Sequence, residues 1–178
     1  MSAPTYDRRL HIWVPTNRRA HLKGKARGTY QSVPTHMDGW NELKAALEKG
    51  RNFGARVFRT NVRHVAKWTR LAMRDAGWPA MDERNAVPVT IDITFVERDR
   101  RRDVGNVHGG AKYALDALTT RHKYGAGAIY DDSQRWLPEV RYHIAYVGER
   151  YREPGLAITI APMEAGDEEA FGEEIPDD

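Results

Sequence analysis

Residues 87–103 read Val87-Pro-Val-Thr-Ile-Asp-Ile-Thr-Phe95-Val-Glu-Arg-Asp-Arg-Arg-Arg-Asp103, and they contain the clearest secondary-structure signal in the chain. Between Val87 and Phe95 every second residue is valine, isoleucine or phenylalanine, which predicts a strand with one buried face. The strand runs directly into four arginines interrupted by Asp99, and the run ends at Asp103. Loops at the ends of strands often carry functional groups on a rigid scaffold. We therefore expect this strand to hold the functional loop.

The rest of the chain separates into segments of strand and helix periodicity. Further strands are predicted at 10–14, 140–146 and 156–160. Helices are predicted at about 40–49, 55–76 and 111–120, two of them closed by Gly50 and Gly77. The basic segment between residues 16 and 36 reads as a long loop. This order predicts an α+β domain in which helices cover a single sheet of approximately four strands.

Length and composition exclude several classes of protein. At 178 residues the chain suits one domain with a hydrophobic core. It has no cysteine, which excludes disulfides and thiolate zinc sites and fits a reducing compartment. The first residues include Asp7, Arg8 and Arg9, unlike the apolar core of a signal peptide. No apolar run approaches the roughly 20 residues needed to span a bilayer. We expect a cytoplasmic protein with no membrane partner.

The charges are divided unequally along the chain. The net charge is +3, with 28 Lys and Arg against 25 Asp and Glu. All the basic residues lie at or before Arg152, and the last 15 residues carry eight acids and no base. The remainder thus has 28 bases and 17 acids, a net charge of +11. A basic body with an acidic tail is typical of proteins that bind nucleic acid, although a solvated, disordered tail is the simpler interpretation.

Basic residues also follow one face of the predicted helix 55–76. Their spacings of three and four residues place them in a stripe about 80° wide at 100° per residue. The stripe consists of Arg56, Arg59, Arg63, Lys67, Arg70 and Arg74. Such a stripe can be an ordinary solvated face, but like charges one turn apart repel each other. An anionic partner, such as the phosphates of a DNA duplex, would offset that repulsion.

Between residues 103 and 132 the chain gathers side chains suited to a hard cation. They are Asp103, Asn106, Lys112, Asp116, Asp131 and Asp132. Clustered carboxylates repel one another, and a cation such as Mg²⁺ between them relieves the repulsion. The ordinary interpretation is that these acids are solvated turn formers and that Lys112 and Asp116 form an i,i+4 helix pair. The arginines beside the acids indicate that the ligand of the metal ion is itself an anion.

The order Asp103-x-x-Asn106, Lys112-x-x-x-Asp116-Ala-Leu and Asp131-Asp132-Ser-Gln resembles the core of the RusA-like crossover-junction endodeoxyribonucleases. These are Holliday junction resolvases common in phages and prophages. The resemblance is strongest over residues 98–135 and extends weakly over about 9–162. It implies a nuclease domain at 1–162, followed by the acidic tail at 163–178. It also implies a homodimer that cuts four-way or branched DNA with Mg²⁺, or Mn²⁺ in its place, and uses no nucleotide cofactor.

By the same resemblance, Asp103 and Asp132 match the family's catalytic, metal-binding aspartates, and Lys112 matches its catalytic lysine. Lys112 would act on the phosphate or the leaving group. Asp116 and Asp131 would support the metal, and Asn106 would either bind it or hold the loop. DNA would meet the helix stripe together with Arg18, Arg19, Lys23, Lys25, Arg100, Arg101 and Arg102.

The chain departs from the family pattern at one ligand position. Gly105 stands where the family's Asp-x-Asp-Asn motif has its second aspartate, and three additional residues separate Asn106 from Lys112. His108 or Asn106 could take over the missing ligand's place, although a loop histidine is the plainer interpretation of His108. Two alternatives to a resolvase remain: a junction- or duplex-binding protein without catalysis, and a nuclease for another branched or flapped substrate. Candidate residues for a dimer interface are Trp13, Trp136 and Tyr142.

Overall fold

The computed structural model describes residues 9–16, 39–148 and 150–163. The basic segment with Arg18, Arg19, Lys23 and Lys25, and the acidic tail after Met163, lie outside the described residues. The strands are β1 (Leu10–Pro15), β2 (Val89–Glu97), β3 (Glu139–Tyr146) and β4 (Gly155–Pro162). The helices are α1 (Trp40–Glu48), α2 (Arg51–Ala76), α3 (Val104–His108) and α4 (Ala111–Leu118).

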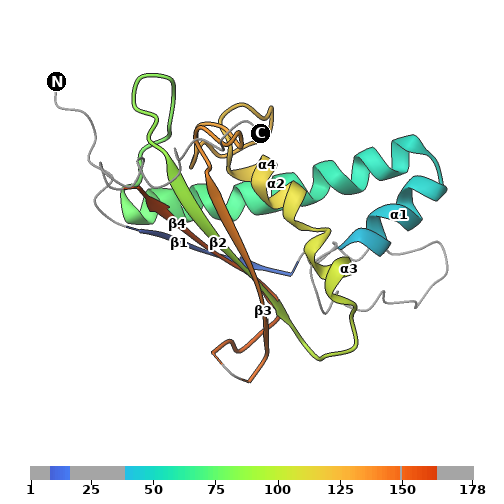
Figure 1. Ribbon diagram of the computed structural model, residues 1–178. Coiled ribbons are helices and arrows are strands. Elements are labelled where there is room, and N and C mark those ends of the chain that lie inside the picture. Colours follow the sequence, from blue (N-terminus) through green and yellow to red (C-terminus); the bar gives the residue numbers. More distant parts are fainter. Residues whose placement is uncertain (1–8, 17–38, 149, 164–178) are drawn as a thin grey trace, which may run out of the picture.

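The strands form one mixed sheet in the order β1-β4-β2-β3 (Figure 1). β4 lies antiparallel to both β1 and β2, whereas β2 and β3 are parallel. A parallel pair needs a long crossover connection, and here α3 and α4 lie within it. The register places Ile93 of β2 opposite Ile158 of β4 and Tyr142 of β3. The single sheet with covering helices confirms the predicted α+β class.

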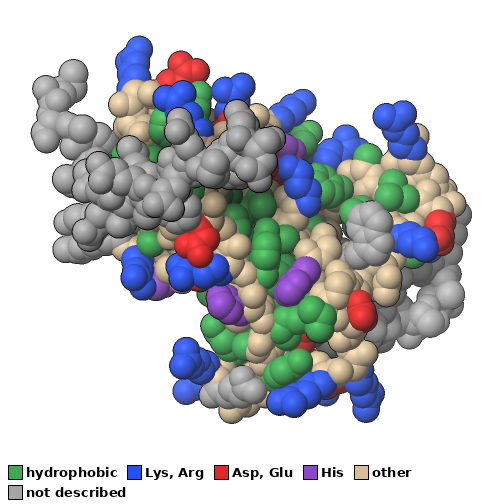
Figure 2. All heavy atoms as spheres, viewed as in Figure 1, with side chains coloured by type: hydrophobic (Ala, Val, Ile, Leu, Met, Phe, Trp, Pro, Cys, Tyr) green, Lys and Arg blue, Asp and Glu red, His purple; other side chains and the backbone are tan. Residues whose placement is uncertain are grey.

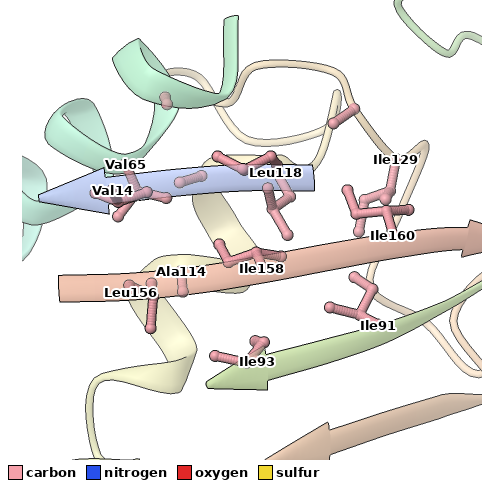
Figure 3. Packing of buried hydrophobic residues seen from close by; sticks show 14 of the residues in the cluster. Val14, Val65, Ile91, Ile93, Ala114, Leu118, Ile129, Leu156, Ile158 and Ile160 are labelled. Carbon is pink, nitrogen blue, oxygen red and sulfur yellow. The ribbon is translucent and has the colours of Figure 1, made fainter. Parts of the chain in front are cut away.

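The core lies between one face of the sheet and the helices α2 and α4 (Figure 3). On β2 the alternating residues Ile91 and Ile93 are fully buried, and Ile158 of β4 beside them is 1% exposed. Val65 of α2 and Leu118 of α4 close over them and are also fully buried. Burying a large aliphatic side chain stabilises a fold by roughly 1.5–3 kcal/mol. This layer therefore fixes α4 against the sheet, and α4 carries Lys112 and Asp116.

Two glycines shape the ends of the long helix α2. Gly77 ends it in the left-handed conformation, with φ of 65°, and its backbone N–H donates to the carbonyls of Met73 and Arg74. Near the other end, a Cβ on Gly54 would overlap the side chain of Leu47 in α1. The missing side chain therefore allows α1 to pack closely against the start of α2.

Several predicted boundaries move by a few residues. α2 begins four residues before the predicted start at residue 55, and β2 covers 89–97 where 87–95 was predicted. β4 extends from 155 to 162, beyond the predicted 156–160. The short helix α3 was not predicted, since 98–110 was expected to be a loop. α2 is long, yet no helix within the described ranges combines the length and apolarity needed to cross a bilayer.

Candidate active site

The ammonium group of Lys112 lies between two carboxylates. Its Nζ is 2.7 Å from Asp116 Oδ1 and 3.0 Å from Asp132 Oδ2. The hydrogen bond to Asp116 is the main reason that the pKa of Lys112 is raised, with a smaller contribution from Asp132. Because both carboxylates meet one ammonium, their oxygens are no farther apart than the sum of these two distances. We call this group the Lys112 centre; it carries two negative charges and one positive charge.

The Lys112 centre is assembled from α4 and from the segment around Asp132, which follows α4 in the chain. Lys112 and Asp116 lie one turn apart on α4, as their i,i+4 spacing predicts. Asp132 reaches them because Ile129 is anchored at the end of α4, where its N–H donates to the carbonyl of Leu118 at 3.2 Å. Asp131 turns the chain at this point, accepting hydrogen bonds from the Asp132 N–H at 3.0 Å and the Ser133 hydroxyl at 3.3 Å. Asp131 thus supports the turn that presents Asp132.

Asp103 and Asn106 form a second group at the start of α3. Asp103 caps this helix, and its Oδ1 accepts a hydrogen bond from the Asn106 N–H at 3.0 Å. The side chain of Asn106 is buried, and its Oδ1 accepts from the Asn41 N–H at the start of α1. Of the two predicted roles for Asn106, this geometry favours holding the loop. A Cβ on Gly105 would lie 3.2 Å from Asp103 Oδ1, so an aspartate there would bring a second carboxylate beside Asp103.

The three consecutive arginines before Asp103 differ in their surroundings. The side chain of Arg102 is 14% exposed, and it pairs with Glu97 Oε1 at 2.7 Å and with Glu42 Oε2 at 3.3 Å. Arg101 is 91% exposed, and its nearest carboxylate, Asp99, is 3.9 Å away. The guanidinium of Arg100 lies 4.8 Å from the ring centre of Tyr146. Arg102 therefore ties the loop to β2 and α1, which leaves Arg100 and Arg101 to face solvent.

The basic stripe of α2 is also divided between two roles. Arg70 donates hydrogen bonds to the carbonyls of Tyr124, at 3.1 Å, and of Gly125. The guanidinium of Arg63 lies 4.2 Å from the ring centre of Tyr124, and its hydrogen bond is the main reason that the pKa of this tyrosine is lowered. These two residues hold the segment after α4 against α2.

The other basic residues of the stripe point outward. Arg59 is exposed and forms no hydrogen bond or ion pair within the described part of the chain. Lys67 and Arg56 are exposed too, with their cations over the rings of Trp68 and Phe53, while Arg74 pairs with Asp75 at 2.8 Å. Figure 2 shows Lys and Arg side chains spread along the upper rim of the molecule and around its lower end, with few acids among them. The outward cations of α2 are thus available to an anionic partner.

The predicted metal ligands do not form one cluster. Within residues 9–16, 39–148 and 150–163, no three Asp, Glu or His side chains lie close enough together to hold a metal ion. The ring of His108 packs between Phe95 and Tyr142, with centroid distances of 5.9 and 5.6 Å. Its Nε2 is buried without a hydrogen-bond partner among the described residues. His108 therefore does not join the carboxylates in this arrangement.

Two side chains that the sequence did not single out have a role beside the site. They are Glu97 and Glu42, the partners of Arg102. Glu97 is only 3% exposed at the end of β2, and Glu42 accepts a hydrogen bond from the Gly39 N–H at 2.8 Å as well. The available signal was a glutamate directly after a buried strand and ahead of an arginine run.

A scan of the chain against protein-family models and a search of curated proteins both find no match.

Proposed function

We propose that the protein is a Mg²⁺-dependent, structure-selective endonuclease that cuts four-way or other branched DNA in the cytoplasm. The observation that carries the proposal is the Lys112 centre, in which one carboxylate from α4 and one from the segment after it share one ammonium. A lysine between carboxylates can also be a simple ion-pair network. The exposed cations of α2 and of the loop at residues 100–101 favour an anionic partner.

The Lys112 centre fits Mg²⁺ in the number and kind of its ligands. Mg²⁺ is usually held by one or two carboxylates, and waters and substrate phosphate oxygens complete its shell. Asp116 and Asp132 supply two carboxylates, whereas Asp103 at the start of α3 does not join them in one cluster among the described residues. When bound, Mg²⁺ would lower the pKa of a water molecule and neutralise charge on the phosphate. Asp131 would keep Asp132 directed toward the ion through the turn that it stabilises.

Lys112 would act on the substrate itself. Without DNA its ammonium pairs with Asp116 and Asp132 at 2.7 and 3.0 Å and offsets one of their two negative charges. With Asp116 and Asp132 holding Mg²⁺, the ammonium of Lys112 would be available to a phosphate oxygen of the DNA, which its flexible stem would allow it to reach. There it would stabilise the negative charge that develops on the phosphate or on the leaving 3′ oxygen. Lys112 is 63% exposed in its side chain, so this movement needs no rearrangement of the core.

The outward cations would position the DNA. Arg59 and Lys67 on α2 and Arg100 and Arg101 on the loop are each exposed or over an aromatic ring, and each can meet a backbone phosphate. Symmetric cutting of a four-way junction needs two active sites related by a two-fold axis. One copy of the Lys112 centre lies in the described residues, so we propose a homodimer. Tyr142 at the sheet edge is 39% exposed and stays a candidate for its interface, with Trp13.

A second candidate function is binding of branched DNA without cleavage. It is favoured by the absence, over the described residues, of any group of three potential metal ligands. Gly105 contributes to that absence, because it supplies no carboxylate beside Asp103. A nuclease for a flapped substrate would share the same centre and differ only in the DNA it accepts.

The deciding experiment is cleavage of an end-labelled four-way junction with Mg²⁺ and with EDTA. We expect nicks in the parental protein only with Mg²⁺. Asp132→Asn should abolish them while binding measured in EDTA stays within a few-fold of the parent. Asp99→Asn is the control, because this half-exposed carboxylate lies on the loop after β2, outside the Lys112 centre. Binding without any Mg²⁺-dependent nick would establish the binding protein, and normal cutting by Asp132→Asn would remove this carboxylate from the chemistry.

A further inference from the structure

A groove lies at the end of the sheet where β2 and β3 begin and β4 ends. Its volume is about 520 Å³, within the range of ligand pockets. Pro88 lines it just ahead of β2, Trp136 and Pro138 line it ahead of β3, and Met163 lines it after β4. Gln134 and Arg135 complete the polar part of its lining. The surface of the groove is therefore polar and apolar in equal measure, and its side chains include one indole, one amide and one cation.

Trp136 is held rigidly within this lining. Its carbonyl accepts a hydrogen bond from the Val89 N–H at 3.0 Å, and its own N–H donates to the Ser133 carbonyl at 2.9 Å. The indole and the ring of Tyr130 pack nearly at right angles, with centroids 5.3 Å apart and planes at 80°. The guanidinium of Arg135 lies 4.9 Å from the centre of the indole ring. A rigid indole with an adjacent cation is the combination on which proteins stack the bases of single strands.

The groove also adjoins the Lys112 centre along the chain. Gln134 lies two residues after Asp132, whose carboxylate binds Lys112, and the turn at Ser133 joins them. A base within a continuous duplex is stacked between its neighbours and cannot enter a groove of this kind. A base at a branch point or in a single strand is free to do so.

We infer that this groove receives one unpaired nucleobase, and that the phosphate beside that base is the one presented to the Lys112 centre. The second half of the inference rests on the proposed function. Trp136 supplies the stacking surface, Arg135 the charge for the adjoining phosphate, and Gln134 the hydrogen bonds to the base edge. Selection of branched over continuous DNA then follows, because only branched DNA offers an unpaired base at the required place.

One competing occupant is the chain's own acidic tail, which starts directly after Met163. The tail carries eight carboxylates over 15 residues, whereas the groove lining contains a single cation and is otherwise apolar or neutral. An aromatic base with one phosphate matches that lining more closely than a polyanionic peptide does. We therefore assign the groove to the base.

The test measures binding without metal, so that it does not depend on cleavage. The probes are a single-stranded oligothymidylate and a blunt duplex of equal length, both in EDTA. Trp136→Ala should weaken single-strand binding about tenfold, since a stacked base contributes that order of affinity, and leave duplex binding within about twofold. Trp136→Phe keeps a ring and should retain most of the affinity. Tyr151→Ala, at the opposite end of β3, is the matched control.

Photocrosslinking gives a second readout that requires no folded alanine variant. An oligonucleotide containing 5-bromouracil should crosslink to residues 134–136 of the parental full-length protein. Equal losses on single strand and duplex, or crosslinks confined to other peptides, would overturn the inference. If crosslinks at 134–136 form only after residues 164–178 are deleted, the acidic tail is the occupant of the groove and the inference is overturned. A protein that crosslinks here but never cuts DNA would keep the groove assignment and lose the proposed nuclease function.

Discussion

Replacing Arg102 by methionine should destabilise the protein, and under the proposed function it should leave DNA binding unchanged, whereas Arg101→Met should do the reverse. The two residues are adjacent and chemically identical, but their side chains are 14% and 91% exposed. Methionine preserves much of the apolar stem and removes only the charge and the hydrogen bonds. The comparison therefore isolates what the surroundings of each guanidinium contribute.

The magnitude follows from the burial of the partners of Arg102. Glu97 has only 4% of its side chain exposed and lies 2.7 Å from the guanidinium, and Glu42 lies 3.3 Å from it. Removing one member of a buried ion pair typically costs about 3–5 kcal/mol. A buried glutamate that has lost its cation can instead take up a proton, which at pH 7 limits the loss in the free energy of unfolding to about 4 kcal/mol. We expect a loss of about 3–4 kcal/mol for Arg102→Met and under about 0.5 kcal/mol for Arg101→Met.

Thermal and denaturant unfolding, followed by circular dichroism, check the first half of this prediction. A loss of about 3 kcal/mol corresponds to a fall in Tm of about 6–12 °C for a chain of this size. The second half is checked by the salt dependence of duplex binding at a temperature where both variants are folded. In a plot of the logarithm of the DNA-binding constant against the logarithm of the salt concentration, Arg101→Met should make the slope shallower by up to about 0.9. Arg102→Met should leave that slope unchanged. A stable Arg102→Met protein with a flattened slope would refute the internal role of this residue and return it to the DNA-binding surface.

Four further outcomes are expected. Gly105→Asp should raise the apparent affinity for Mg²⁺ in cleavage assays, because the new carboxylate lies beside Asp103; a fall in activity would contradict this. Replacing Arg59 and Lys67 together by glutamine should flatten the salt slope of DNA binding by up to about 0.9 for each phosphate that is no longer neutralised, with Tm nearly unchanged. Burial lowers the pKa of His64 below 6.5, so parental stability should fall as pH drops below about 6.5, and a His64→Gln variant should show a flatter pH profile in Tm scans. Sedimentation near micromolar concentration without DNA should give a dimer, and a strict monomer would exclude concerted double cutting.

The sequence predicted the elements of the fold more reliably than their arrangement. Alternation of apolar residues located all four strands. One face is buried in β1, β2 and β4, whereas β3 at the edge of the sheet contains no fully buried residue. The pairing of β2 with β3 as parallel neighbours was not predicted, since strand order depends on contacts between distant segments. α3 was missed because Gly105, Gly109 and Gly110 lower the helix propensity of its surroundings. The signal that could have located it is the cap formed by Asp103 on the Asn106 N–H.

The candidate site shows the same division between local and distant information. The pairing of Lys112 with Asp116 follows from a spacing of four residues on a helix, and the structure contains it at 2.7 Å. Asp132 joins the pair only because Ile129 is fixed at the end of α4, a contact between segments that no local pattern specifies.

Arginines 100–102 demonstrate the limit of charge patterns most directly. A run of like charges predicts an anionic partner for the whole run, but it carries no information about which side chain turns inward. That choice is made by Glu97, which remains buried at the end of β2 after the alternation has stopped, and by Glu42 at the start of α1. Both carboxylates need a cation within the protein, and Arg102 is the arginine that reaches them. The inward arginine holds the loop in place, and its neighbours Arg100 and Arg101 on that loop stay exposed to solvent.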